Sequence, residues 1–177
     1  PEDWNIFLIK NLTTEVRDGI HSTPVYSNNG DYFFINGNNL KNGKVIINEY
    51  AKKVNLSEFI LHKRNLTYRT ILISINGTIG NVAFYQGENI LLGKSVAYLN
   101  VKQEISKHYL YFALQTKTVN DFFRNGLTGT TIQNLGLNTI KNTPVPIPKS
   151  YQEQEKIAQV LSDFDSAIAH LDKLISK

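Results

Sequence analysis

The segment Thr143-Pro144-Val145-Pro146-Ile147-Pro148, followed closely by Ser150-Tyr151-Gln152-Glu153, decides how this chain is organised. Three prolines at alternate positions fix the backbone φ angles, so the segment is extended and cannot be helical. The serine and the glutamate three residues later match the capping box, in which each side chain satisfies a free backbone N–H of the first helical turn. The sequence therefore predicts a boundary at residue 150 and a helix that begins directly after it.

The predicted helix over residues 151–177 carries an apolar stripe of the coiled-coil type. Its apolar residues recur at alternating spacings of four and three, and Val160, Ala167 and Leu174 widen the stripe. A stripe of this width needs a partner surface, either a second helix or the globular part of the same chain. The pattern is unbroken at Lys177, so we expect the helix to be truncated there. The positions predicted to face the partner are Ile157, Leu161, Phe164, Ile168, Leu171 and Ile175.

Residues 1–150 contain signals for both strands and helices. Strands clustered in the middle and helices toward the end indicate an α+β fold, in which a mixed, β-rich domain with packed helices precedes the long helix. Runs of β-branched and aliphatic residues predict a strand over 70–75, a second over 81–85 after a turn at Asn76-Gly77, and another formed by 90–92 with 95–101. Helices are predicted over 106–124 and, after the cap-like Asn55, through residue 62.

Composition limits the classes of protein to which the chain can belong. With 177 residues and 41% hydrophobic content, it can form one domain with a core. The absence of cysteine excludes disulfides and thiolate chemistry and fits the reducing cytoplasm. No stretch approaches the roughly 20 apolar residues of a membrane span, and residues 1–10 lack a signal-peptide pattern. We therefore expect a cytoplasmic protein with no membrane contact.

The net charge of +4 is unevenly distributed. Residues 151–177 carry five acidic residues against three lysines, which is −2 and leaves +6 for residues 1–150. A basic globular part suits a polyanionic partner, because such a partner releases counterions when it binds.

Recognisable catalytic motifs are missing. The segment 87–95 resembles a phosphate-binding P-loop, but five residues separate its first glycine from Gly93-Lys94-Ser95 where the motif needs four. The four histidines are scattered, with no pair at the spacing that places two ligands on one helix face. No Asn/Asp-Pro-Pro-aromatic motif of adenine methyltransferases is present. We therefore expect neither metal nor cofactor, and any catalysis must come from a partner.

Several segments together resemble the specificity subunits of type I restriction-modification enzymes. Their order along nearly the whole chain carries the resemblance, since each piece alone is weak. They are Trp4, the segment 18–24 (DGIHSTP), Gly77-Thr78-Ile79-Gly80, Gly129-Thr130-Thr131-Ile132-Gln133, and the junction formed by Pro146-Ile147-Pro148, Glu153-Gln154 and Ile157-Ala158.

The resemblance implies that residues 1–150 are one target-recognition domain and residues 151–177 the start of a conserved spacer helix. In this family, two recognition domains held apart by antiparallel helices each read half of a bipartite site in double-stranded DNA. Methyltransferase subunits dock on that frame, and a restriction subunit can join them. The chain then represents a half-module, whose second recognition domain comes from the same polypeptide or from a homodimer partner.

Residues that read bases should be exposed, polar and close to turns. Arginine can bind guanine in bidentate fashion, and asparagine or glutamine can bind adenine. Other roles stay open: Asn76-Gly77 is first of all a turn sequence, and Arg17 can pair with Glu15 or Asp18. The candidates are Arg17, His21, Asn38, Asn76, Thr78, Lys94, Arg124, Thr130 and Gln133.

Two alternative functions belong to other classes. One is a protein-interaction module that uses the coiled-coil helix and does not bind DNA specifically. The other is a small hydrolase with an unrecognised site. Salt-dependent binding to duplex DNA separates the first alternative from DNA recognition, and only turnover would support the second.

Overall fold

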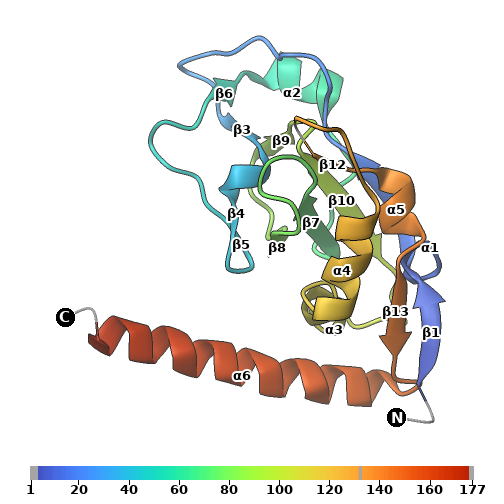
Figure 1. The fold of residues 1–177 in the computed structure, drawn as a ribbon. Coiled ribbons are helices and arrows are strands. Elements are labelled where there is room, and N and C mark those ends of the chain that lie inside the picture. Colours follow the sequence, from blue (N-terminus) through green and yellow to red (C-terminus); the bar gives the residue numbers. More distant parts are fainter. Residues whose placement is uncertain (1–3, 132, 176–177) are drawn as a thin grey trace.

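A four-stranded antiparallel sheet lies at the centre of the protein in the computed structural model, which describes residues 4–131 and 133–175 (Figure 1). Its two inner strands are mostly apolar, and all of their residues are buried. Short apolar runs of this kind are typical of strands covered on both faces. The strand order is β2 (Thr13–Asp18), β10 (Val96–Val101), β7 (Thr70–Ser74) and β8 (Val82–Phe84).

A second, smaller sheet covers one face of the central sheet. In it β3 (Tyr32–Ile35) pairs antiparallel with β6 (Lys53–Val54) and parallel with β9 (Ile90–Leu92). Alternate residues of a strand point to opposite faces, so Leu72 and Tyr98 of the central sheet point toward this layer, where they pack with Ile35, Leu40, Ile90 and Leu92.

Helices cover the opposite face of the central sheet. They are α1 (Ile9–Leu12), α3 (Lys107–Ala113), α4 (Lys117–Asn125) and α5 (Leu137–Lys141). The largest of three core clusters among the described residues forms here, where Ile71, Ile73, Ala97 and Leu99 of the sheet pack with Leu110, Leu114, Val119, Phe123 and Ile140 of the helices and their ends.

The remaining elements are short. Helix α2 (Leu56–His62) is capped by Asn55, whose side chain accepts a hydrogen bond from the N–H of Glu58, as predicted. Two hairpins and one turn of 3-10 helix carry surface loops: β4 (Leu40–Lys41) with β5 (Lys44–Val45), β11 (Leu127–Thr128) with β12 (Asn134–Leu135), and η1 (Gly37–Asn39). In the part of the chain that the structure describes, no helix is both long and apolar enough to cross a membrane.

The fold class is confirmed, and two details of the sequence interpretation are wrong. The predicted helix over 106–124 is broken into α3 and α4, because Thr116 is extended, donates its hydroxyl to Ala113 O and caps Val119 N–H. The residues 90–92 and 95–101 form two strands in different sheets. The chain turns at Gly93, whose carbonyl accepts from the N–H of Val96 at 3.0 Å, and passes from one layer to the other.

The proline segment forms the extended strand β13 (Pro144–Ile147), which pairs antiparallel with β1 (Asn5–Leu8). This ribbon places Trp4 beside the first turn of α6 (Tyr151–Ile175), where Trp4 Nε1 donates to Glu153 Oε1 at 3.1 Å. The Ser150 hydroxyl accepts from Glu153 N–H at 3.4 Å, so the serine half of the predicted capping box is present. The glutamate ties the N-terminal segment to α6.

Gln154 fastens α6 to the domain. Its side chain is buried; Oε1 accepts from Ser106 N–H and Nε2 donates to Pro148 O, both at 2.9 Å. Nearby, Tyr109 packs edge-on against Trp4 and donates to Pro146 O at 2.8 Å, and burial raises the pKa of its hydroxyl to about 12. The first two turns of α6 are therefore part of the globular unit.

Beyond these turns α6 runs along beneath the globular part in this view, and its C-terminal end passes the edge of the domain (Figure 1). Ile157 is partly buried and packs on the core, whereas every described residue from Gln159 onward is exposed. Phe164 is 63% exposed and Ile168 56%. The alternative in which the apolar stripe folds back onto its own domain is therefore wrong for most of the helix.

We predict that Gln154→Leu lowers the free energy of unfolding by about 2–6 kcal/mol, because it leaves two buried backbone groups without partners at about 1–3 kcal/mol each. Gln159→Leu is the matched control, since Gln159 lies on the same helix but is exposed. Urea unfolding measures both variants. Equal effects of the two substitutions would contradict the role given to Gln154.

Candidate nucleic-acid interface

Four chain segments meet beyond the end of β7 and the start of β10, and we call their common surface the loop face. They are residues 36–47, 76–81, 93–95 and the described part of 127–134. The first and third are tied by Ser95, whose Oγ accepts from Gly37 N–H at 2.9 Å and donates to Asn36 Oδ1 at 3.1 Å. Gly37 in turn lies against Ser74 and the backbone of Asn76.

The loop over 76–81 turns tightly around Ser74. Gly80 N–H donates to Ser74 O at 2.9 Å, the Ser74 hydroxyl donates to Thr78 O, and Asn81 N–H donates to that hydroxyl at 3.0 Å. Both Gly77 and Gly80 have positive φ angles, 73° and 89°, which confirms the turn predicted at Asn76-Gly77. The tip of the loop is thus held by its own backbone, and the side chains of Asn76 and Thr78 are left for other contacts.

The β11–β12 hairpin joins the same surface. Asn134 forms an isolated β-bridge with Asn76, and Leu135 N–H donates to Ile75 O at 2.8 Å. These contacts place the turn that carries Thr130 and Gln133 beside the 76–81 loop. Ile132 of the predicted motif lies outside the described residues.

The composition of the loop face is unusual. Its described residues include no aspartate or glutamate, but they include Lys41, Lys44, Lys94 and seven asparagines. A surface without carboxylates does not repel phosphates, and amide side chains can donate and accept at base edges. The asparagines are Asn36, Asn38, Asn39, Asn42, Asn76, Asn81 and Asn134.

Six of the nine predicted residues lie on the loop face: Asn38, Asn76, Thr78, Lys94, Thr130 and Gln133. Asn76 is half-buried and the other five are exposed. Within the described ranges, none of these side chains makes an intramolecular hydrogen bond or ion pair that would occupy it. Arg124 lies next to the face on α4, the helix whose Asn120 contacts Gly80, and it is likewise exposed.

Arg17 and His21 lie in a different setting. Arg17 Nε pairs with Glu15 Oε1 at 3.1 Å, and His21 Nε2 pairs with Asp18 Oδ2 at 2.7 Å. His21 follows Ile20, which bridges to Gly93, so it borders the loop face. Arg17 lies on the edge strand β2, beside a separate shallow depression of about 350 Å³ that is also lined by Lys10 and Lys141. The structure therefore places His21 at the border of the loop face and Arg17 apart from the other candidates.

The sequence interpretation overlooked the β4–β5 hairpin, which adds Lys41, Asn42 and Lys44 to the loop face. A signal was available, because Asn-Gly between short apolar runs is the strongest short-range hairpin sequence, and here a lysine flanks each side.

The P-loop-like segment does not have the structure of a P-loop, and the histidines do not form a metal site with other described residues. Strand β9 occupies the middle of the P-loop-like segment, and Gly93-Lys94-Ser95 forms a turn into β10 instead of the start of a helix. Among the described residues no three His, Cys, Asp or Glu side chains gather as a metal site would require.

Comparison with known proteins gives one consistent result. The model of a family described as the type I restriction modification DNA specificity domain matches residues 1–177. The type I restriction enzyme MjaIX specificity subunit of Methanocaldococcus jannaschii is 29% identical over 98% of this chain and 40% of its own length. A putative type I specificity subunit of Mycoplasma pneumoniae, S.MpnORF638P, is 37% identical over 63% of this chain and 29% of its own.

Solved structures agree at the level of the fold. The type I restriction-modification S subunit from M. genitalium has a TM-score of 0.66 with 24% identity, over 98% of this chain and 42% of the other. The HsdS subunit from Thermoanaerobacter tengcongensis has a TM-score of 0.65 with 16% identity, over 98% of this chain and 40% of the other. The chain spans about two fifths of the length of the relatives that it matches from end to end.

We predict that Ser95→Ala loosens the loop face, because Gly37 N–H and the Asn36 side chain each lose a partner, at a cost of about 1–2 kcal/mol. Amide hydrogen exchange should show faster exchange at Gly37. Ser22→Ala is the control, since Ser22 is exposed and outside the loop face. Unchanged protection of Gly37 would show that Ser95 does not hold the segments together.

Proposed function

Because this chain belongs to the family of type I restriction-modification DNA specificity domains, we propose that its loop face reads base sequence in duplex DNA. The observation that carries this proposal is the acid-free loop face, on which Asn38, Asn76, Gln133 and the lysines have no intramolecular side-chain partner among the described residues. The family is that of the non-catalytic specificity subunit, so the chain supplies recognition and not chemistry.

Different side chains of the loop face suit different parts of DNA. Asn38, Asn76 and Gln133 match the donor–acceptor pattern of adenine, and Arg124 can bind guanine in bidentate fashion. Thr78 and Thr130 can bond either a base edge or a phosphate, and Lys94 suits a phosphate. Arg17 already pairs with Glu15, and His21 is already hydrogen-bonded to Asp18, so they are peripheral candidates.

The second part of the proposal concerns the division of the chain. Residues 1–150 form the recognition domain and residues 151–177 the start of a spacer helix, which holds this domain at a fixed distance from a second one. Helix α6 has 25 described residues, which corresponds to a length of about 37 Å at 1.5 Å per residue. Its exposed stripe supports a helical partner, because large apolar side chains in a row favour burial against another helix.

In this arrangement each recognition domain reads half of a bipartite site. The paired spacer helices provide the frame on which methyltransferase subunits dock, and a restriction subunit can join the assembly. A solved structure that matches this fold, with a TM-score of 0.68 at 15% identity, is described as concerning complex assembly of the type I system. The partner of α6 comes from a second recognition module, in the same polypeptide or in another copy.

The exposed stripe also favours a role in protein interaction alone. That alternative requires no affinity for DNA. It predicts that α6 variants lose association while duplex DNA has no measurable effect on the wild-type chain at any salt concentration.

We predict that replacing both Leu161 and Ile168 by aspartate abolishes self-association of the chain, because two charges would enter an apolar seam. Sedimentation equilibrium over a range of concentrations measures the effect. Replacing both Ser162 and Ala169 by aspartate adds the same charge at the same spacing off the stripe, and it should leave association intact. A wild-type chain that is strictly monomeric at high concentration, with these residues packed only on residues 1–150, would contradict the spacer proposal.

Selection from random duplexes tests DNA reading, with the chain fused to a second specificity module at fixed salt. We expect a short, reproducible half-site. Gln133→Ala should relax preference at one position, by the 1–3 kcal/mol that a bidentate base contact typically contributes (about 5- to 150-fold). In separate binding titrations over a range of salt concentrations, Lys94→Ala should weaken all duplexes alike and lower the slope of log K against log salt by about 0.9.

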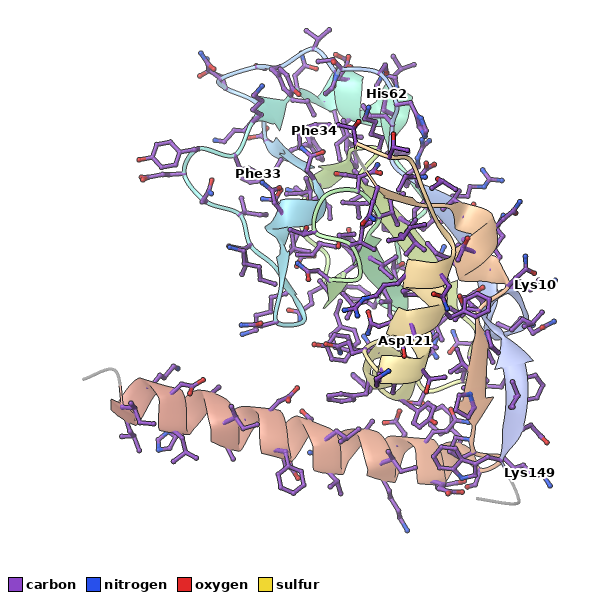
Figure 2. The ribbon with its side chains drawn as sticks, viewed as in Figure 1. Lys10, Phe33, Phe34, His62, Asp121 and Lys149 are labelled. Carbon is purple, nitrogen blue, oxygen red and sulfur yellow. The ribbon has the colours of Figure 1, made fainter. Side chains whose placement is uncertain are left out.

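Lys149→Ala is the charge-matched control for Lys94, because Lys149 lies near the start of α6 and away from the loop face (Figure 2). Arg17→Ala tests separately whether the edge strand takes part. Enrichment of no motif by a folded fusion would contradict the proposed function.

A further inference from the structure

The tip of the β4–β5 hairpin carries two lysines directly opposite each other. Lys41 and Lys44 are cross-strand partners, so their side chains leave the same face of the hairpin, and both are exposed. Like charges in this position destabilise a hairpin. Neither lysine has a carboxylate partner among the described residues. The repulsion between the two ammonium groups lowers the stability of the hairpin, and a bound anion would remove this repulsion.

The backbone of the tip is fixed, in contrast to its side chains. Asn42 and Gly43 both have positive φ angles, 49° and 75°, as a two-residue type I′ turn requires. Gly43 O accepts from Phe84 N–H at 3.0 Å, and a Cβ at residue 43 would lie 2.9 Å from the hydroxyl oxygen of Tyr111. The turn is therefore pressed onto the domain at Gly43, and only glycine fits there.

A shallow depression of about 230 Å³ adjoins the hairpin, lined by Lys41, Asn42, Gly80, Asn81, Val82 and Gln115. This is roughly the volume of eight water molecules at about 30 Å³ each, which leaves room for one phosphodiester group and bridging waters. Its polar lining consists of an ammonium and three side-chain amides, with no acidic side chain. Asn81 also donates to Leu40 O at 3.1 Å, which joins the hairpin to the 76–81 loop.

We propose that the β4–β5 hairpin and this depression bind the sugar–phosphate backbone of duplex DNA. This inference rests on the proposed function and assigns a separate task within it. The loop side chains select bases, whereas the paired lysines fix the register of the duplex and contribute affinity that is independent of sequence. Two positive charges carried by a fixed turn suit phosphate groups, which carry no sequence information themselves.

The test compares K41Q/K44Q with K10Q/K149Q in the 177-residue chain. Both double variants remove two positive charges, but Lys10 and Lys149 lie on the opposite side of the molecule from the hairpin (Figure 2). Fluorescence anisotropy with a duplex that contains the selected half-site, and with a scrambled duplex, is measured across a range of salt concentrations.

We expect K41Q/K44Q to weaken both duplexes by the same factor. It should lower the slope of log K against log salt by about 1.8, or about 0.9 for each phosphate that the variant no longer neutralises. The ratio of affinities for the two duplexes should stay unchanged, and K10Q/K149Q should bind as the wild type does.

Three results would overturn the proposal. If K41Q/K44Q lowers the slope no more than K10Q/K149Q does, while the wild type still prefers its half-site, only the hairpin proposal fails. If K41Q/K44Q changes the ratio between the two duplexes, the lysines read bases and the assigned task is wrong. If the wild type shows no salt-dependent binding to either duplex, the proposed function fails together with this inference.

Discussion

The close approach of the two sheets at Gly93 is the constraint on which the rest of the structure depends. A Cβ at this position would lie 2.5 Å from Asn36 Oδ1 and 2.8 Å from Cζ of Phe34, next to β3, and a Cβ at Gly19, after β2, would lie 2.3 Å from Gly93 O. Gly93 N–H donates to Ile35 O at 2.8 Å, and Gly93 bridges to Ile20. The crossing therefore holds the ends of β2, β3 and β9 at the start of β10, and the loops that leave these ends share one surface.

Local sequence patterns predicted some parts of the fold, whereas contacts between distant residues determined the others. The proline segment and the apolar stripe after it are local patterns, and they correctly predicted an extended strand followed by a long helix. The break at Thr116 was hidden, because apolar residues continue on both sides of it and the cap depends on one hydroxyl. The separation of β9 from β10 depends on strand pairing with distant residues, which no local pattern contains.

The positions of most candidate residues on one face could be predicted from local turn sequences. Turn sequences such as Asn76-Gly77 mark where polar side chains reach the surface, and six of nine candidates lie on one face. The sequence could not predict which candidate side chains bond to other groups of the same chain. Arg17 and Glu15 are alternate residues of one strand, so their side chains leave the same face and pair there. Arg64 and Arg69 are basic, but their guanidinium groups bond backbone carbonyls. On the loop face the lysines and some of the amides, such as Asn38 and Asn76, have no intramolecular side-chain partner among the described residues.

The loop face and helix α6 belong to one rigid unit, because Gln154 and Trp4 bind the first turn of the helix to the domain. A duplex on the loop face would therefore hold a fixed direction relative to the spacer. An NMR titration of the ¹⁵N-labelled chain with duplex DNA tests the central claim most directly. We expect amide shifts to concentrate in residues 36–47, 76–81, 93–95 and 127–134. Shifts concentrated on α2 or on the edge strand β2, with the loop face unaffected, would contradict it.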